Sequence, residues 1–588
     1  MDRMKKIPYG KSDFKLIRGE DYYYVDKTSF IPKIEAAADN FFFLRPRRFG
    51  KSLLLSMLKT YYDIAERDNF EKWFGGLDIY KDGPTPKMGS YLVLDFDFSS
   101  FRGDSSSFEE QFDNEIMGRL DYFMTKYKYL LPDGTYNKIM SISTVNQALS
   151  RLCGIVNLAG YGIYLFIDEY DNYTNTLISG DAKSRTAYDT LTHDDGILRS
   201  FFAQIKKCTD ICIQRMFITG VSPVSMDDIT SGYNIGKDHT AVPAFNSMVG
   251  FNEEEILSML DYYGSHLNFN HSTDELLGIM RPWYDNYCFS QDSLTEAPLY
   301  NSDMVLSFLY DYTARKCKLP VSMVDRNVKS DISKMLLLVS KDKELGLEDN
   351  SVIMEVATKG YTYGNIKDSF RAEELSDKDN LRSLLFYMGY LTFSREQDGD
   401  FSLLAIPNLV IREIVYEKLV KMYTAQGVEF DSSQITQCLR TASETGDFTP
   451  MSDYISETIL HFSSERDKAK GEHFLHGMIL SMFTPSGRYF PISEGDAGGG
   501  KGYSDIALFP RVRTFPSIKH SFILELKYAK SGASDLTVDN MRKEATEQAL
   551  RYLSSSRILP DMLQTQIHAL VLVFRGVKLE IIEEVGKK

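Results

Sequence analysis

The sequence predicts an α/β protein with three regions: a parallel-sheet region at 1–250, a mostly helical region at 251–420 and a mixed α/β region at 421–588. In the first region, short and nearly continuous apolar runs alternate with helical stretches, a pattern typical of a sheet that helices cover on both faces. In the second region, apolar residues recur at helical spacing. In the third, short strands and helices alternate again.

The individual elements follow from these patterns. The expected strands of the first region are 40–44, 91–98, 161–167 and 215–219. The helical region opens with GFNEEEILSMLDYYGSHL, in which acidic residues occupy a first turn and apolar residues follow at helical spacing. The third region is expected to contain helices at 472–483 and 542–553 and a strand at 568–574.

Composition excludes several classes of protein. The 588 residues carry a net charge of −15, which argues against a broad nucleic-acid-binding surface, although the residues from 501 onward have more basic than acidic side chains. No apolar run is long enough to span a membrane, and the N-terminus lacks the apolar core of a secretory signal. Six scattered cysteines indicate reduced core thiols and no zinc site. We therefore expect a cytoplasmic protein without membrane contact.

Residues 41–52, FFFLRPRRFGKS, predict a phosphate-binding loop between a buried strand and a helix. Gly50, Lys51 and Ser52 open the helix, where backbone amides and the helix dipole favour an anion. Lys51 is expected to reach the terminal phosphates of ATP, and the Ser52 hydroxyl to bind Mg²⁺. Arg45 occupies the position of the first glycine of the usual motif. The side chains of Arg45, Arg47 and Arg48 are expected to contact phosphates, a neighbouring subunit or only solvent. The alternative is a chance G-K-S after a strand.

A second motif supports nucleotide binding. In YGIYLFIDEYDNY, an apolar strand ends in Asp168 and Glu169, as a Walker B element does. Asp168 is expected to hold Mg²⁺ through water, and Glu169 to polarise the attacking water. Thr219 ends a further strand and is a candidate sensor of the terminal phosphate. The alternative is a strand that ends in ordinary solvated acids.

Three charged residues near the C-terminus predict a second site. Asp505 begins the strand YSDIALFP, while Glu525 and Lys527 lie two apart in the strand SFILELKYAK and so share one face. Charges within an apolar strand are costly unless they pair or bind metal. Asp505 and Glu525 are therefore candidate Mg²⁺ ligands, and Lys527 is a candidate catalytic cation for phosphodiester hydrolysis. The alternative is a structural Glu–Lys pair at a sheet edge.

Two predicted helices flank these strands. Glu472 heads the amphipathic segment GEHFLHGMILSMF and is a candidate third catalytic carboxylate. Gln548 and Tyr552, four residues apart on a later helix, are expected to face the same site.

The whole chain resembles bacterial AAA-ATPase-like proteins with a C-terminal PD-(D/E)XK nuclease-superfamily domain. The resemblance rests on IPYGKSDFKLI, YYYVDKTSFI, RPRRFGKS and YLFIDEYDN near the N-terminus, on GFNEEEI, RPWYDNYCF and IPNLVIREIV in the middle, and on GEHFLHGMIL, GYSDIALF, FILELKYAK and EQALRYL near the end. Arg45 is expected in this family, whereas Asn286 replaces a glycine of its W-Y-D-G-Y element.

The resemblance implies a P-loop ATPase domain, ATP and Mg²⁺ as cofactors, and a restriction-endonuclease-like domain. Nucleic acid, DNA before RNA, is the expected partner of the C-terminal region, and an oligomer is compatible with the sequence. Our main hypothesis is an ATPase that gates a Mg²⁺-dependent nuclease. One rival is an ATP-switched regulator or scaffold whose nuclease-like fold only binds. Another is a structure-specific nuclease whose phosphate-binding loop serves assembly.

Overall fold

The computed structural model describes residues 3–101, 108–178, 188, 190–192, 196–224, 236–320, 322–326, 328–330, 351–395, 402–465, 472–493, 505–554 and 562–586. The chain divides into two compact units. Unit 1 comprises 1–339 and 365–393, and unit 2 comprises 340–364 and 394–588. The predicted boundaries at 250 and 420 stay a prediction.

Unit 1 is built on a five-stranded parallel sheet with the order β2-β3-β4-β1-β5. Its strands are β1 (Asn40–Leu44), β2 (Leu92–Asp97), β3 (Ile163–Asp168), β4 (Ile213–Gly220) and β5 (Lys237–Asp238). The first four are the strands that the sequence predicts. Strand β4 lies between β1 and β3, so the strand of the phosphate-binding loop and the strand that ends in Asp168 are not neighbours.

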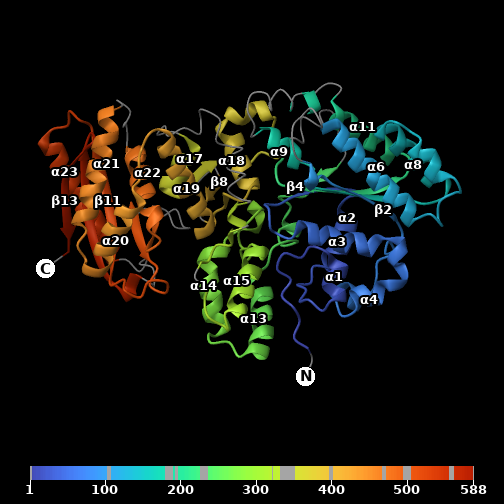
Figure 1. Cartoon of the computed structure of the whole chain (residues 1–588), viewed down its shortest axis with the longest axis horizontal. Coiled ribbons are helices and arrows are strands. Elements are labelled where there is room, and N and C mark those ends of the chain that lie inside the picture. The colour runs from blue at the N-terminus through green and yellow to red at the C-terminus, as the bar shows by residue number, and fades with distance from the viewer. Residues whose placement is uncertain are drawn as a thin grey trace. The chain divides into compact units, whose positions relative to one another are not determined.

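Helices cover both faces of this sheet. Figure 1 shows α1, α3 and α4 on one side and α6, α8 and α11 on the other. The helices up to residue 209 are α1 (Phe14–Gly19), α2 (Phe30–Ala37), α3 (Lys51–Tyr62), α4 (Phe70–Phe74), α5 (Asp78–Asp82), α6 (Phe108–Lys126), α7 (Thr135–Met140), α8 (Val145–Leu158), α9 (Asn172–Ile178) and α11 (Ile197–Thr209). The strands are buried between these two layers, which is why they are apolar on both faces.

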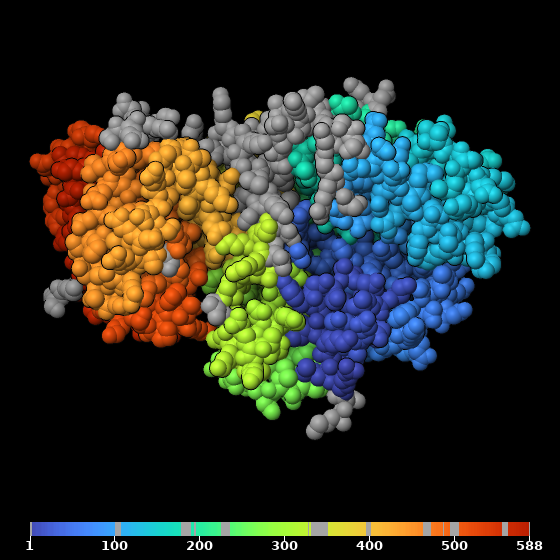
Figure 2. Space-filling model, viewed as in Figure 1, coloured from blue at the N-terminus to red at the C-terminus, as the bar shows by residue number. Residues whose placement is uncertain are grey.

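The predicted helical region supplies further helices to unit 1. They are α13 (Glu253–Leu267), α14 (Thr273–Tyr284), α15 (Ser302–Ala314) and α18 (Lys378–Tyr387). Capping boxes at Asn252 and Ser272 start α13 and α14. Asn286, which stands where a glycine is expected, adopts a φ of +80° and so keeps the turn. Figure 2 shows α13 to α15, in green, packed directly against the N-terminal segment, in dark blue.

Unit 2 contains a five-stranded mixed sheet with the order β13-β12-β11-β10-β9. Its strands are β9 (Tyr489–Ser493), β10 (Ile506–Pro510), β11 (His520–Ala529), β12 (Gln566–Arg575) and β13 (Lys578–Val585). Strands β11 and β12 are parallel and the other pairs are antiparallel. Outside this sheet, strands β6 (Tyr361–Gly364) and β8 (Ser402–Ala405) pair antiparallel.

The helices of unit 2 include both that the sequence predicts in its last region. They are α17 (Val352–Lys359), α19 (Leu409–Ala425), α20 (Ser432–Thr445), α21 (Thr449–Glu465), α22 (Glu472–Phe483) and α23 (Asp535–Leu553). Helix α23 packs on one face of the sheet through Ala545 and Ala549, which contact Ala529, Val571 and Val573. Small residues on both sides allow this close approach.

The buried centre of unit 1 makes a stability prediction. Leu165 lies in β3 and is completely buried. Leu165→Ala removes its contacts and leaves a cavity, so we expect the free energy of unfolding to fall by about 2–5 kcal/mol. Both tryptophans, Trp73 and Trp283, belong to unit 1, so their fluorescence during denaturant unfolding measures this unit. Tyr129→Ala, at a site 86% exposed, is the control; an equal loss in both variants would contradict the prediction.

Candidate functional site

The predicted phosphate-binding loop joins β1 to α3. Gly50 is the N-cap residue of α3 and has a φ of +95°, a conformation that strains any residue with a Cβ atom. Arg48 also adopts a positive φ, of +69°. The Leu54 amide donates to the Gly50 carbonyl and starts the regular helix. The loop thus turns sharply without the first glycine of the usual motif, and it presents the N-terminus of α3 to a cavity.

Lys51 is buried, and its side chain folds back on the loop. Its Nζ donates hydrogen bonds to the carbonyl oxygens of Arg45, at 2.9 Å, and Pro46, at 3.0 Å. Burial lowers the pKa of the Lys51 ammonium, and the nearby carboxylates of Asp168 and Glu169 oppose this effect. The ammonium therefore lies next to the helix N-terminus, held by two neutral acceptors that an anion can outcompete.

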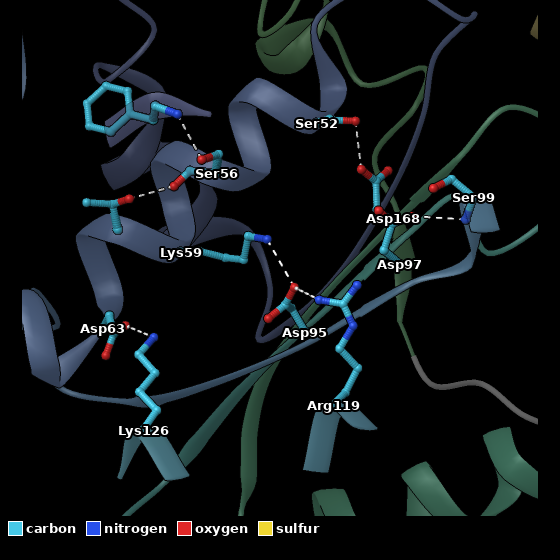
Figure 3. A network of polar contacts seen from close by, with 12 residues as sticks. Ser52, Ser56, Lys59, Asp63, Asp95, Asp97, Ser99, Arg119, Lys126 and Asp168 are labelled. Carbon is cyan, nitrogen blue, oxygen red and sulfur yellow. Dashed lines mark hydrogen bonds and ion pairs between the residues drawn. The ribbon is translucent and has the colours of Figure 1, made fainter. Parts of the chain in front are cut away.

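Ser52 and the two predicted Walker B acids meet at the same edge of the sheet. The Ser52 hydroxyl donates to Asp168 Oδ2 at 2.7 Å, and Figure 3 shows this contact with Asp97 beside it. Asp97 is the register partner of Asp168 across β2 and β3. The backbone at Glu169 has a φ of +50°, and its amide donates to Asp168 Oδ1 at 2.9 Å. A hydroxyl and a carboxylate in contact are oxygen donors of the kind that Mg²⁺ binds.

Burial raises the pKa of both acids. For Asp168, the hydrogen bond from Ser52 and the charge of Lys51 partly offset the effect, while the charge of Asp97 adds to it. For Glu169, the charges of Arg47 and Lys51 partly offset it. Two partly buried carboxylates with raised pKa values beside a lysine are characteristic of a functional site.

Arg45 does not face this site, which corrects its assignment as a nucleotide-binding side chain. Its guanidinium is 1% exposed and lies between the rings of Phe43 and Phe289, at 4.3 and 4.4 Å. It donates to the carbonyl oxygens of Thr240, at 2.7 Å, and Phe245, at 3.1 Å. The side chain is thus turned away from the cavity and supports the loop from within the protein.

Thr219 is also placed differently from the prediction of a phosphate sensor. It is fully buried in β4, and its hydroxyl donates to the Phe43 carbonyl at 2.6 Å. A hydroxyl has one proton to donate, and a phosphate sensor has to donate it to phosphate. Thr219 instead ties β4 to β1.

A cavity of about 340 Å³ opens over the loop. Residues 47–54 and Glu169 line one part of it. The rest of the lining comes from the N-terminal segment, residues 23–25 and 27, residues 248–251, Met259 and the start of α15. Most of the side chains from these other segments are apolar or aromatic. The cavity therefore joins a cationic, amide-rich end to an apolar end, which suits a nucleotide.

Two contacts attach α15 to the loop. The Ser302 hydroxyl donates to the Arg48 carbonyl at 3.3 Å, and the Arg48 guanidinium lies 3.5 Å from the Asp303 carboxylate. Sequence reasoning did not single out either α15 residue, because they lie some 250 positions from the loop.

Asp171 is a further residue that the sequence did not single out. The residue is buried, at 1% exposure. Its Oδ2 atom accepts hydrogen bonds from the backbone amides of Val221, at 3.0 Å, and Ser222, at 2.6 Å. It thereby connects the segment after β3 to the segment after β4. In the sequence, the signal that could have identified Asp171 is its place in D-E-Y-D, directly after the two predicted Walker B acids.

Helix α3 is connected to β2 and α6 by ionic contacts. Lys59 and Arg119 both contact the Asp95 carboxylate, at 3.2 and 3.4 Å, as Figure 3 shows. Asp63, at the end of α3, pairs with Lys126. The two pairs with Asp95 are partly exposed and contribute modestly to stability, whereas Asp63 is buried.

In unit 2, the three predicted residues gather on the face of the sheet that α23 covers. In the antiparallel register of β10 and β11, Asp505 falls opposite Glu525. Both are buried, at 7% and 1% exposure, and the Leu526 amide donates to Asp505 Oδ2. Lys527 Nζ lies 3.7 Å from Glu544 Oε1 on α23. The predicted common face of Glu525 and Lys527 follows from strand alternation.

The two helices predicted to flank these strands, α22 and α23, differ in what they bring to the predicted site. On α23, Tyr552 packs against Ala507 and Ile523, and the Oε1 atom of Gln548 is buried without a hydrogen-bond partner among the described residues. Glu472 is exposed at the start of α22. Within the described part of the chain, no three His, Cys, Asp or Glu side chains are grouped so as to hold a metal. The structure therefore does not bring Glu472 to the Asp505 and Glu525 pair, and its role stays a prediction.

Comparison with known proteins agrees with the two sites. Residues 8–230 match the family model described as predicted AAA-ATPase, and residues 470–584 match the PD-(D/E)XK nuclease superfamily. The predicted combination of these two families is confirmed. The chain has a P-loop ATPase-like parallel sheet, a helical middle part and a C-terminal mixed sheet of the PD-(D/E)XK nuclease type.

One curated relative is the "uncharacterized protein in vnfD 5′ region" of Azotobacter chroococcum mcd 1, 26% identical over 319 residues. The alignment covers 52% of this chain and 52% of that protein, so the chain spans about half the length of the relative.

Solved structures give distant matches. A Walker-type ATPase of Pyrococcus abyssi is 11% identical with a TM-score of 0.37, covering 71% of this chain and 99% of that one. Cdc6p of Pyrobaculum aerophilum is 13% identical with a TM-score of 0.26, covering 64% of this chain and 88% of that one.

In the described part of the chain, no helix has both the length and the apolar character to cross a membrane.

The raised pKa of Glu169 predicts a pH-dependent stability difference. A carboxyl whose pKa is higher in the folded than in the unfolded state destabilises the folded state increasingly as pH rises through the folded pKa. Glu169→Gln removes this cost, so we expect the variant to be more stable than the wild type at pH 8. The difference should shrink as pH falls toward 4.

Tryptophan fluorescence during unfolding at several pH values measures this difference. Glu110→Gln, at an exposed position of α6, is the matched control and should leave the unfolding midpoint unchanged. A Glu169→Gln variant that is less stable than the wild type at pH 8, with the difference shrinking toward pH 4, would show that the carboxylate is instead stabilised by its cationic neighbours.

Proposed function

We propose that this protein binds and hydrolyses ATP in unit 1 and that unit 2 is a Mg²⁺-dependent nuclease whose activity depends on the nucleotide state. The observation that carries the ATPase assignment is that Lys51, Ser52 and Glu169 line one end of a nucleotide-sized cavity, with Asp168 hydrogen-bonded to Ser52. The cytoplasm is the proposed location, and DNA before RNA the proposed substrate.

In this proposal the backbone amides at the start of α3 and the Lys51 ammonium bind the phosphates. The carbonyl oxygens of Arg45 and Pro46 hold that ammonium until an anion replaces them as its partner. Ser52 and Asp168 would hold Mg²⁺, which when bound offsets phosphate charge. Glu169 would accept a proton from the attacking water; its raised pKa makes it a better base than an exposed glutamate.

The nuclease assignment is supported by the opposed carboxylates of Asp505 and Glu525 and by Lys527 on the same face. Carboxylate oxygens fit Mg²⁺, which would polarise the scissile phosphate. The backbone amide of Leu526 orients the Asp505 carboxylate. Lys527 would stabilise charge that develops on the phosphate oxygens, and Gln548 has an amide oxygen still able to accept a hydrogen bond.

An alternative function is an ATP-switched binding module without cleavage. One observation favours it: Lys527 is paired with Glu544, and only two carboxylates approach each other in the described part of the site. A substrate phosphate would have to displace Glu544, which is 62% exposed, from Lys527. The two functions make different predictions for catalysis.

Substitutions test the ATPase assignment. Lys51→Ala removes the buried cation, and we expect ATP affinity to fall about 100-fold or more, measured by titration calorimetry. Glu169→Gln should bind ATP as the wild type does, while kcat falls about 10²–10⁴-fold. Lys81→Ala, on the exposed side of α5, is the control. Hydrolysis that survives both substitutions would place the ATPase activity elsewhere.

Cleavage assays test the nuclease assignment. The substrates are circular and linear, single- and double-stranded DNA and RNA, with Mg²⁺ or Mn²⁺ and with or without ATP. Asp505→Asn and Lys527→Ala should each lower the cleavage rate about 10²–10³-fold, because each removes a group that contacts the reacting phosphate or its metal. The matched control is Lys530→Ala, an exposed lysine three residues along the chain.

The same assay separates the alternatives. Dependence of cleavage on ATP that disappears in Lys51→Ala would support gating. Cleavage indifferent to Lys51→Ala would favour a stand-alone nuclease. Metal-independent binding of nucleic acid without any cleavage would favour the binding module.

A further inference from the structure

The three arginines of the R-P-R-R segment have three different environments. Arg45 is enclosed by backbone carbonyls and two aromatic rings. Arg48 pairs with Asp303 on α15. Both Arg47 and Arg48 line the cavity with Lys51 and Glu169. Because the Arg48 guanidinium is paired with Asp303, and the charge of Arg47 acts on Glu169, Arg47 is the arginine that we assign to the catalytic end of the cavity.

Arg47 is positioned by one side chain. Its Nη2 donates to Asn172 Oδ1 at 3.0 Å, and Asn172 in turn donates from Nδ2 to the carbonyl oxygens of Phe98, at 3.2 Å, and Ser99, at 3.4 Å. The amide of Asn172 is thereby oriented by the segment that follows β2, with its oxygen left for Arg47. This arrangement fixes the guanidinium without enclosing it.

The guanidinium retains hydrogen-bonding capacity. Its Nε is buried and has no hydrogen-bond partner among the described residues, and the bond to Asn172 uses only one of its five N–H donors. A buried donor without a partner is costly, and a ligand that supplies an acceptor removes that cost.

The charges around Arg47 indicate which ligand suits it. Arg47 and Lys51 are both cationic and line one cavity, an arrangement that repels unless an anion lies between them. The charges of Asp168, Glu169 and Asp171 act on Lys51, and the charge of Arg47 acts on Glu169. Asp168 is already held by Ser52, and Asp171 by two backbone amides. The terminal phosphate of a nucleoside triphosphate supplies oxygen acceptors that Arg47 and Lys51 can share.

We propose that Arg47 is a catalytic residue of the ATPase site, which binds the terminal phosphate of ATP from within the phosphate-binding loop of the same chain. This inference rests on the proposed ATPase function and adds to it the group that distinguishes ATP from ADP. Planar guanidinium donors suit phosphate oxygens. An arginine supplied at this point of phosphoryl transfer accelerates the reaction about 10³–10⁵-fold in other P-loop enzymes.

In the proposed step, the oxygen of water forms a bond to the terminal phosphorus while the bond from that phosphorus to the bridging oxygen breaks. ADP leaves with the electron pair of the broken bond, and Glu169 accepts the proton of the water. Arg47 and Lys51 offset the negative charge on the phosphate oxygens. Asn172 is a positioning residue that holds Arg47 in place.

The test compares Arg47→Ala with Arg47→Lys and with Arg151→Ala, an exposed arginine on α8 outside the cavity. Calorimetry measures the Kd of ADP and of a non-hydrolysable ATP analogue, and steady-state assays measure kcat. We expect Arg47→Ala to lower kcat about 10³-fold and to weaken the analogue about tenfold, with ADP affinity within about threefold of the wild type. Arg47→Lys should recover analogue binding more than kcat, because it keeps the charge but not the fork of donors.

Other outcomes overturn the inference. An unchanged kcat, or an equal loss of affinity for ADP and the analogue, would show that Arg47 only supports the loop. Arg47→Lys keeps the test valid if Arg47→Ala does not fold, which tryptophan fluorescence reveals. If the wild type binds neither nucleotide, the proposed function fails and the inference fails with it; if the wild type binds and hydrolyses ATP but Arg47→Ala does so equally, only the inference fails.

Discussion

The nucleotide site depends on the burial of one guanidinium. Arg45 replaces the first glycine of a phosphate-binding loop, and burial lowers the pKa of its guanidinium to about 9. Such a group is tolerated in the interior only when its donors are satisfied. Here the carbonyl oxygens of the chain around 240–246 accept hydrogen bonds from the two terminal nitrogens, Nη1 and Nη2, and two aromatic rings cover the faces of the guanidinium. The loop is therefore attached to the segment after β5 and to the ring of Phe289, in addition to its own strand.

This attachment has consequences for the rest of the loop. With the Arg45 side chain turned inward, its carbonyl and that of Pro46 point to the Lys51 ammonium. Arg48 and Arg47 both line the cavity, and Arg48 is paired there with Asp303 of α15. The loop that has Arg45 in place of the first glycine thus holds its three arginines in different environments. Arg45 is in the core, Arg48 is paired with a residue of α15, and Arg47 is in the nucleotide site. The parallel sheet completes the site, because the carboxyl ends of β2 and β3 bring Asp97 and Asp168 side by side.

Unit 2 positions its charged groups by a different arrangement of strands. Two antiparallel strands place Asp505 opposite Glu525, and the alternation of side chains along β11 sets Lys527 on the same face. Alanines at the contact with α23 let that helix approach closely, so Glu544 and Gln548 come to lie at the edge of the same face. In each unit, charged groups are held at the end or face of an apolar sheet, where burial strengthens their mutual interactions.

By itself, the sequence predicted the first four strands of unit 1, the helices α22 and α23 and the combination of the two families. These features depend on local hydrophobic periodicity and on short-range spacing. The directions of Arg45 and Thr219 were not predictable, because their partners, Thr240, Phe245 and Phe43, belong to segments that meet only in the folded sheet. The same reason applies to Asn172 and Asp171, whose side chains bind backbone groups of the segments that follow β2 and β4. A local pattern decides which side chains are available, and only long-range packing decides which acceptor each of them reaches.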